Sequence, residues 1–233
     1  MISVIILNYK RPNILKKHIL PFLDKQQLIA EIIVSHGIEK TAFYDSFAKV
    51  RYINDFSLQL EMAHARRYIR AKEVKSNFTL ILDDDILPSG DTIFRLYDEI
   101  VKYPYCIHGT RGRAAKGGYK FANVYGNVPV LLGKLLLFPS EFIEYFWKHQ
   151  TTVLPYVEAH SDHMWNGDDI FFCLAVLKET GVLHRAHRFK VKEFLLTQTR
   201  GISRNRFAHL ARRKSFLTYC IDALDLGEFV EQC

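Results

Sequence analysis

Three consecutive carboxylates follow an apolar segment that is rich in β-forming residues. The segment 78–82 predicts a buried strand, and Asp83, Asp84 and Asp85 come directly after it. In open α/β sheets this end of a strand borders the crevice that holds a ligand. Neighbouring carboxylates repel one another, and a hard divalent cation with oxygen ligands would relieve that repulsion. The simpler alternative is a solvated turn, because Pro-Ser-Gly follows at 88–90.

The outer two carboxylates of this run are separated by a single residue. An extended chain places alternate side chains on one side, so we expect Asp83 and Asp85 to face the same way. One of them would then hold the cation, and the other would hold a sugar hydroxyl.

A second pair of carboxylates stands at the predicted start of a helix. Asp168 and Asp169 follow Gly167, and a helical pattern continues over 170–179. An ordinary N-cap is one explanation, because the helix dipole stabilises negative charge at this end. Together with the first run, the pair indicates a division of roles. One cluster would bind a metal ion, and the other would act as general base or stabilise positive charge on a sugar.

The last predicted helix carries a third candidate pair. His209 and Arg213 are four residues apart and therefore share a helix face. A cation there could hold a departing diphosphate or an acceptor. The alternative is that His209 only fills space among the apolar residues of this helix.

Composition indicates one core and an uneven charge. The chain has 233 residues, of which 48% are hydrophobic, and a net charge of +7. Segment 184–214 holds ten Lys and Arg residues against one acid, Glu193, so it carries +9 and the rest of the chain −2. Such a segment suits phosphates, nucleic acid or an anionic membrane, or is simply a solvated face. The four cysteines show no CxxC spacing and are expected to be reduced thiols.

The hydrophobic pattern alternates between strands and helices in the first hundred residues. This alternation predicts a three-layer α/β/α sandwich with a mixed, mainly parallel sheet. The strands are expected at 2–8, 31–35, 50–54 and 78–82, and the helices at 12–23, 58–75 and from Asp91 onward. In the second half, strand-like segments are expected at 106–109, 119–125, 128–138 and 182–192, a loop at 111–118, and helices at 140–149, 170–179 and 205–224.

Three blocks of the sequence resemble nucleotide-sugar glycosyltransferases of GT-A fold, and among them the exostosin-like enzymes of glycosyltransferase family 64. Segment 3–11 (Ser-Val-Ile-Ile-Leu-Asn-Tyr-Lys-Arg) is similar to the opening strand and nucleotide loop of that family. Segment 82–85 (Leu-Asp-Asp-Asp) is similar to its metal motif, and segment 166–170 (Asn-Gly-Asp-Asp-Ile) to its later acidic block. A weaker fourth block, His209 and Arg213 followed by Tyr-Cys-Ile at 219–221, is spaced four residues further apart than in the family. Inverting family 2 enzymes are the second choice.

The resemblance implies roles for the donor side of the site. Asn8, Tyr9 and Arg11 would contact uracil, ribose or diphosphate. Asp85 and Asp83 would hold a manganese or magnesium ion that bridges the diphosphate, with Asp83 and Asp84 near ribose and sugar. Arg66 or Arg67 would approach the donor.

The resemblance also implies roles for the catalytic side. Asp168 or Asp169 would lie against the transferring sugar and the acceptor, with Arg213 near the diphosphate and His209 beside it. A relationship to family 64 favours retention of the anomeric configuration. A relationship to family 2 favours inversion, with Asp168 or Asp169 as the base.

The sequence therefore predicts a metal-dependent enzyme that moves a sugar from a UDP-sugar to a hydroxyl of a glycan or glycoconjugate. We expect one domain over 1–233, with a nucleotide-binding half at 1–103 and an acceptor-binding half at 104–233. Two other classes stay open. A sugar nucleotidyltransferase would show a glycine-rich loop after the first strand, whereas segment 8–11 has no glycine. A nucleic-acid-binding module would use segment 184–214 and would leave both carboxylate clusters unexplained.

The distribution of apolar and charged residues also predicts where in the cell the protein is located. No charged leader precedes the first strand, and no apolar run reaches the length of about 20 residues that a membrane span needs. A cytoplasmic enzyme of bacterial or viral type is expected, without a nucleic-acid partner. Peripheral membrane contact through the basic segment 184–214 is a further hypothesis.

Overall fold

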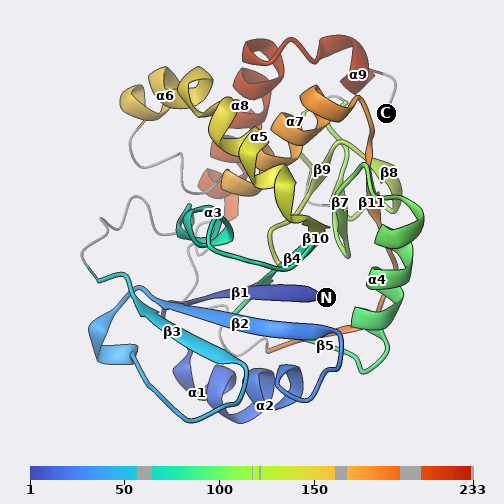
Figure 1. Ribbon diagram of the computed structural model, residues 1–233. Coiled ribbons are helices and arrows are strands. Elements are labelled where there is room, and N and C mark those ends of the chain that lie inside the picture. Colours follow the sequence, from blue (N-terminus) through green and yellow to red (C-terminus); the bar gives the residue numbers. More distant parts are fainter. Residues whose placement is uncertain (57–64, 117, 121, 161–166, 195–205, 232–233) are drawn as a thin grey trace.

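The computed structural model describes residues 1–56, 65–116, 118–120, 122–160, 167–194 and 206–231 (Figure 1). Among these residues, the predicted alternation of strands and helices is present in the first half of the chain. Part of the predicted helix 58–75 and the centre of the basic segment 184–214 lie outside the described residues.

Four parallel strands form one half of the central sheet. Their order is β3 (Val50–Asn54), β2 (Ile29–His36), β1 (Ile2–Asn8) and β4 (Phe78–Asp83). β1 is central because its residues are apolar on both faces, which suits a strand covered on both sides. All four run in the same direction, so their carboxyl ends meet at one edge of the sheet. This edge carries the predicted strand-end carboxylates.

The second half of the sheet is mixed. β10 (Leu135–Pro139) pairs antiparallel with β4 and with β6 (His108–Gly109). β11 (His184–Ala186) then pairs parallel with β6, and β8 (Gly126–Val128) closes the sheet. Two small sheets lie beside it: β5 (Ile86–Pro88) with β12 (Val191–Glu193), and β7 (Gly112–Arg113) with β9 (Val130–Leu131). The expected mixed, mainly parallel sheet is confirmed.

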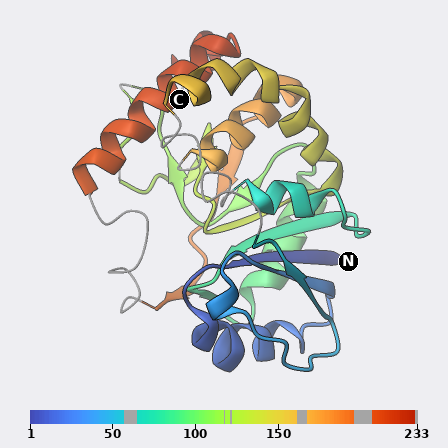
Figure 2. The same ribbon diagram turned by 90° about the vertical axis from the view of Figure 1, so that its left-hand side faces the viewer.

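Helices cover both faces of the sheet, as Figures 1 and 2 show. One layer contains α1 (Pro12–Ile14), the π-helix η1 (Leu15–Ile19), α2 (Leu20–Leu23) and α4 (Thr92–Lys102). The opposite layer contains α3 (Arg66–Ala71), α5 (Ile143–Lys148), α7 (Asp168–Thr180) and α8 (Arg206–Ala223), with the short η4 (Ser140–Phe142), α6 (Gln150–Ala159) and α9 (Gly227–Glu231) beside them. The other short helix, the 3-10 helix η2 (Glu39–Thr41), follows β2.

Alternation along the strands separates the two cores. In β1, Ile5 packs toward α3 and α7, whereas Val4 and Ile6 pack toward the layer of α1 and α2. Residues Ile170–Leu177 of α7 are all buried, which is typical of a helix enclosed on every side. The helix ends where Gly181 adopts φ 66°, a left-handed conformation that favours glycine.

The second half of the chain departs from the sequence predictions in four places. The predicted strand 128–138 is interrupted at Gly133 and forms parts of β8, β9 and β10. The described part of 119–125 contributes only an isolated bridge at Val124, and the predicted loop 111–118 contains the buried strand β7. Helix α6 was missed because Pro155 lies inside it. None of the described helices is long and apolar enough to cross a membrane.

Candidate active site

The first carboxylate cluster lies at the end of β4, and we call Asp83, Asp84 and Asp85 the strand carboxylates. β4 ends at Asp83, and the chain turns at Asp84 and Asp85 before β5 begins. The expectation that Asp83 and Asp85 face the same way is therefore wrong, because it assumed a chain extended through all three residues. Asp84 and Asp85 instead face Arg11, and Asp83 faces Arg67.

Arg11 neutralises two of the strand carboxylates. Its Nη1 lies 2.5 Å from Asp84 Oδ1, and its Nη2 lies 3.4 Å from Asp85 Oδ2. The backbone N–H of Tyr9 donates to Asp84 Oδ2 at 3.3 Å, so the loop after β1 is fastened to the turn after β4. Burial alone would lower the pKa of Arg11, but Asp84 and Asp85 raise it above its usual value. Burial raises the pKa of Asp84, and Arg11 opposes that rise.

The second cluster, Asp168 and Asp169 at the start of α7, comes close to the first; we call these two residues the helix carboxylates. Arg67 on α3 joins the clusters: its Nη1 lies 3.5 Å from Asp83 Oδ1, and its Nε lies 3.3 Å from Asp168 Oδ2. The side chains of Arg67 and Asp168 are each only 7% exposed. The guanidinium of Arg67 therefore contacts both Asp83 and Asp168, although these residues are 85 positions apart in the sequence.

Gly133 completes the connection between the clusters. Its carbonyl accepts a hydrogen bond from Arg67 Nη1 at 2.8 Å, and its N–H donates to Asp169 Oδ2 at 3.0 Å. A Cβ at this position would lie 2.8 Å from Arg67 Nη1 and 3.3 Å from the Cβ of Asp169. Any side chain at this position would displace the Arg67 guanidinium from the Gly133 carbonyl, so glycine suits the close approach.

Arg213 on α8 fixes the other helix carboxylate. Its Nη2 donates to Asp169 Oδ1 at 2.7 Å, and its guanidinium lies 4.7 Å from the ring centre of Tyr119. Burial would raise the pKa of Asp169, but Arg213 and the N–H of Gly133 hold it below its usual value. Asp169 is therefore a firmly charged carboxylate.

Two other carboxylates of the site have elevated pKa values. Burial raises the pKa of Asp83 to about 7, against the opposing charge of Arg67. Burial likewise raises the pKa of Asp168 to about 6, with Arg67 opposing the rise and Asp169 adding to it. Neighbouring carboxyl groups with different pKa values are typical of sites that carry out acid–base chemistry or bind cations.

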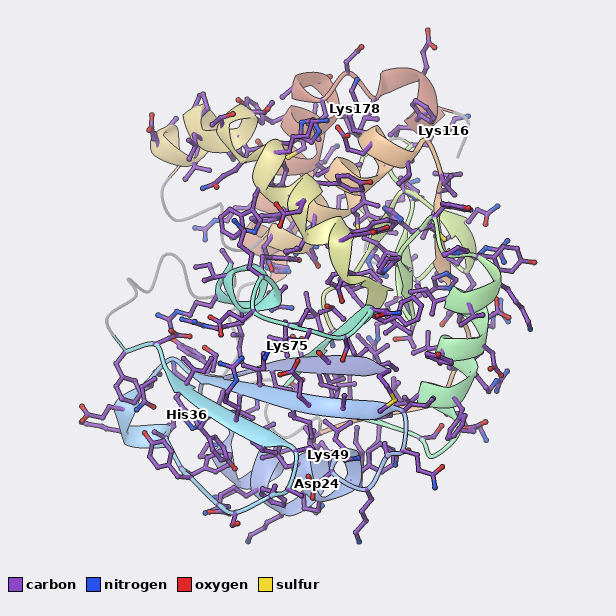
Figure 3. All side chains as sticks on the ribbon, viewed as in Figure 1. Asp24, His36, Lys49, Lys75, Lys116 and Lys178 are labelled. Carbon is purple, nitrogen blue, oxygen red and sulfur yellow. The ribbon has the colours of Figure 1, made fainter. Side chains whose placement is uncertain are left out.

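The remaining predicted residues lie around this centre. Asn8 is fully buried, and its Nδ2 donates to Thr41 O and to Nδ1 of His36 (labelled in Figure 3), both at 2.8 Å. Its position indicates that Asn8 shapes the loop after β1 rather than facing a ligand with its amide nitrogen. Arg66 is buried against the backbone after β2, where a Cβ on Gly37 would lie 2.5 Å from its Nη1.

His209 belongs to the same region. It is half-buried on α8, four residues before Arg213. Burial, together with the charge of Arg213, lowers the pKa of His209 to about 4. The ring is therefore neutral near pH 7 and suits a hydrogen-bonding role better than a cationic one.

The strand carboxylates have the donor chemistry of a hard divalent cation. Carboxylate oxygens are the ligands that Mg²⁺ and Mn²⁺ prefer. The side chain of Asp85 is 14% exposed and that of Asp83 is 31% exposed, so a ligand can reach both. An ion at Asp85 would compete with Arg11 for the carboxylate, since the guanidinium now supplies the positive charge there.

A group of possible metal ligands that the sequence analysis missed lies elsewhere in the fold. Glu99, His108 and His187 each offer one ligand atom, and these atoms lie within 4.8 Å of one another. Among the described residues, this is the only such trio of His, Cys, Asp or Glu groups. No spacing motif could have revealed it, because each residue comes from a different element.

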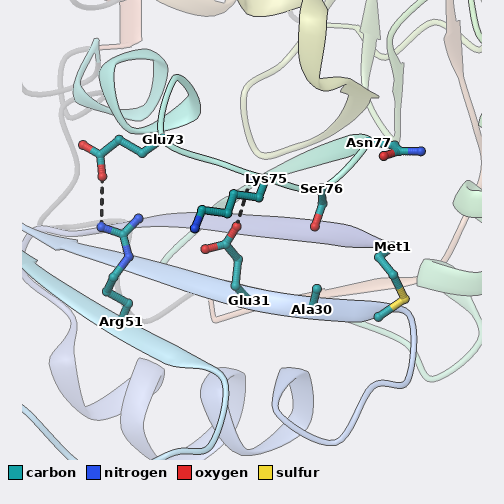
Figure 4. Close-up of a pocket in the computed structure, with 8 residues that line it drawn as sticks. All are labelled: Met1, Ala30, Glu31, Arg51, Glu73, Lys75, Ser76 and Asn77. Carbon is teal, nitrogen blue, oxygen red and sulfur yellow. Dashed lines mark hydrogen bonds and ion pairs between the residues drawn. The ribbon is translucent and has the colours of Figure 1, made fainter.

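A cavity of about 830 Å³ lies at the opposite edge of the sheet (Figure 4). Glu31, Arg51, Glu73 and Lys75 contribute its charged lining. Arg51 pairs with Glu73 at 3.0 Å, and Glu31 accepts from the backbone N–H of Lys75 at 3.3 Å. Ligand crevices of open α/β sheets lie at the carboxyl ends of the strands, so this cavity is a weaker candidate than the carboxylate site.

In the described part of the basic segment 184–214, some cations are engaged within the fold, whereas others, such as Lys190 and Lys192, are exposed. Arg185 packs over Tyr103, Arg188 packs over Tyr125, and Arg213 is buried against Asp169. Phe194, the last residue described before 195–205, donates its N–H to the Asp85 carbonyl at 3.1 Å. The segment therefore approaches the strand carboxylates, and the hypothesis of membrane contact gains no support from it.

Comparison with known proteins locates the chain by its fold. No family model matches the sequence, and no curated protein matches it. Among solved structures, the crystal structure of GalNAc-T7 with UDP, GalNAc and Mn²⁺ is similar, with a TM-score of 0.58 and 12% sequence identity. The match covers 83% of this chain and 43% of that one, so this chain spans somewhat less than half of its neighbour's length. The chain thus has the expected GT-A, Rossmann-like fold.

Proposed function

We propose that this protein is a metal-dependent glycosyltransferase that moves a sugar from a UDP-sugar to a hydroxyl of a glycan or glycoconjugate. The observation that carries the proposal is the meeting of the strand and helix carboxylates around Arg67. This meeting occurs at the carboxyl edge of a sheet whose fold resembles that of GalNAc-T7, a protein solved with UDP and Mn²⁺. Nucleotide ligands of open α/β sheets bind at this edge.

The donor would bind at the strand carboxylates. Asp85, with Asp83, would hold Mn²⁺ or Mg²⁺, and the ion would neutralise charge that grows on the departing diphosphate. Arg11 is 16% exposed, so its guanidinium can turn from Asp84 and Asp85 toward a phosphate. Tyr9 follows β1, and the guanidinium of Arg66, the first residue of α3, lies beside Gly37 after β2, where ribose and base would lie in this proposal.

The transferring sugar and the acceptor would meet the helix carboxylates. Asp169 is kept charged by Arg213 and Gly133, which suits stabilisation of positive charge on the sugar. Asp168 has an elevated pKa, and its Oδ2 meets Arg67 Nε only as an ion pair at 3.3 Å without hydrogen-bond geometry, which suits a group that takes up a proton when Arg67 turns toward a ligand. His209 would orient the acceptor through a neutral ring.

Two finer parts of the proposal follow the sequence resemblance. Membership of family 64 predicts retention of the anomeric configuration, and a family 2 relationship predicts inversion with Asp168 or Asp169 as base. We also propose that 1–103 form the nucleotide-binding half and 104–233 the acceptor-binding half. Product stereochemistry, determined by NMR on the first turnover product, separates the two families.

The decisive experiment is calorimetric titration of UDP into the protein with and without Mn²⁺. We expect Mn²⁺ to strengthen UDP binding. In the presence of Mn²⁺, Asp85→Asn should bind UDP at least about tenfold more weakly than the native protein. Asp91→Asn is the matched control, because Asp91 is exposed, close in sequence and outside the site. A screen of UDP-sugars for hydrolysis then identifies the donor. UDP binding that ignores both Mn²⁺ and Asp85 would overturn the proposal.

A further inference from the structure

Two imidazoles and a carboxylate converge beneath α4, away from the carboxylate site. His108 Nδ1 lies 3.0 Å from His187 Nε2, and the ligand atoms of both rings and of Glu99 lie within 4.8 Å of one another. His108 pairs with Leu137, which in turn pairs with Leu80, three residues before Asp83. At about 3.3 Å per residue, the trio is roughly 10 Å from the carboxyl edge along the strand direction. It is therefore separate from the strand carboxylates.

The tautomer of His108 leaves the correct nitrogen available. Its Nε2 lies 2.9 Å from the carbonyl oxygen of Tyr103, so Nε2 carries the proton and Nδ1 keeps its lone pair. A second nitrogen bonded to a backbone carbonyl is the usual support of a metal-binding histidine.

We propose that Glu99, His108 and His187 form a second cation site, selective for a borderline metal ion such as Zn²⁺. Two neutral imidazoles and one carboxylate, with water in the fourth position, form a common tetrahedral zinc set. Zn–N bonds of about 2.0–2.1 Å place two ligand nitrogens roughly 3.3 Å apart. The present separation of 3.0 Å, in which His187 Nε2 donates to His108 Nδ1, thus needs a small adjustment. The half-buried His187 ring would turn toward the ion and take the tautomer with its proton on Nδ1, which frees Nε2 as a ligand.

The surroundings leave room for the fourth ligand and moderate the affinity. Glu99 and His187 line a cavity of about 400 Å³ together with Asn127, so water can reach the open position. Arg185 Nη1 lies 3.8 Å from Glu99 Oε2, and its positive charge opposes a cation. Nitrogen ligands favour Zn²⁺ over Mn²⁺, so the two proposed sites have different ion preferences.

The test is calorimetric titration of Zn²⁺ into chelator-treated full-length protein, alongside thermal denaturation with and without Zn²⁺. We expect one Zn²⁺ to bind and to raise Tm, because a ligand of the folded state stabilises it. Glu99→Gln and His187→Gln should each weaken binding at least about tenfold, while Arg185→Gln should tighten it. Asp98→Asn is the matched control: Asp98 is exposed beside Glu99 and lines the same cavity, but it is not one of the three ligand groups.

The outcomes separate this site from the carboxylate site. Glu99 is only half-buried, so Glu99→Gln should fold, and circular dichroism checks this. Zn²⁺ binding that persists in Asp85→Asn and fails in Glu99→Gln supports the proposal. Binding that is equal in Glu99→Gln and Asp98→Asn, binding lost in Asp85→Asn instead, or no binding to the native protein would each overturn it.

Discussion

The two carboxylate clusters carry similar charge but are held in different ways. The strand carboxylates rest in a turn, and both Asp85 and its partner Arg11 keep some exposure, 14% and 16% of their side chains. The helix carboxylates begin a buried helix, and Asp169 and its partner Arg213 are each 7% exposed. The first cluster can exchange its counter-ion, whereas the second is fixed. The proposed function would use both properties, one for a metal-bound nucleotide and one for a rigid catalytic charge.

Removing a fixed counter-ion should produce the largest effect. Arg213→Met leaves Asp169 charged and buried without its partner, and breaking such a pair costs about 3–5 kcal/mol of unfolding free energy. Arg11→Met, at the strand carboxylates, should cost less, about 1–3 kcal/mol, because the buried Asp84 keeps the N–H of Tyr9 and has a raised pKa, so it can take up a proton when its partner is lost. Urea unfolding followed by circular dichroism measures both values. Equal losses would remove the distinction between the clusters.

The next effect concerns catalysis. If the helix carboxylates serve the sugar and the acceptor, Asp169→Asn should lower turnover of a UDP-sugar by about 10²–10⁴-fold. Its Mn²⁺-dependent UDP affinity should stay within about threefold of the native value, because the metal is held elsewhere. Steady-state kinetics and calorimetry on the same preparation provide the two readouts. A parallel loss of UDP affinity would mean that the clusters act as one binding site.

The pH dependence of stability should differ between the clusters. A carboxyl whose folded pKa is raised, as for Asp83 at about 7, favours the folded state when protonated, so stability falls as pH rises from about 4 to 7. Asp169, with a lowered pKa, instead contributes stability that is lost as pH falls below its usual value.

Asp83→Asn tests this contrast. The variant should lose less stability than the native protein between pH 5 and 8, by about 1 kcal/mol after allowance for partial exposure. Thermal denaturation in chelator at both pH values measures the difference, and Asp91→Asn is the exposed control. An identical pH response in native protein and Asp83→Asn would show that Asp83 does not titrate in this range.

The smallest expected effect concerns competition between Arg11 and a metal ion for the strand carboxylates. Arg11→Gln removes the guanidinium that lies 3.4 Å from Asp85, so Mn²⁺ should bind several-fold more tightly in the absence of nucleotide. UDP should bind more weakly to the same variant if Arg11 also contacts the diphosphate. Calorimetry with each ligand separates the two effects. Weaker Mn²⁺ binding would show that Arg11 supports the ion instead of competing with it.

Local pattern was sufficient for the elements that present the carboxylates. The apolar run before Asp83 predicted β4, and Gly167 with the following apolar residues predicted α7, because both signals lie within a few neighbouring residues. Their convergence on one site was expected from the occurrence of two carboxylate clusters and from the family resemblance, not from the strand–helix alternation. The chemical roles assigned to these residues stay predictions.

The counter-ions were less predictable. Arg11 faces Asp84 and Asp85 because the chain turns after Asp83, and strand periodicity does not reveal where an extended chain stops. Gly133 appeared to lie within a continuous strand, because the apolar residues around it concealed the break. Specific partners across the fold depend on tertiary packing, which no local window of sequence contains.

Gly133 also has a consequence for how the protein folds. Its carbonyl accepts from Arg67, its N–H donates to Asp169, and Arg213 completes the set, so these contacts connect four distant segments of the chain. Contacts between residues so far apart form late, because the loops between them must first close. Slow hydrogen exchange at the Gly133 amide would therefore mark a fully folded molecule, and a partly folded chain with most of its helices would lack the site.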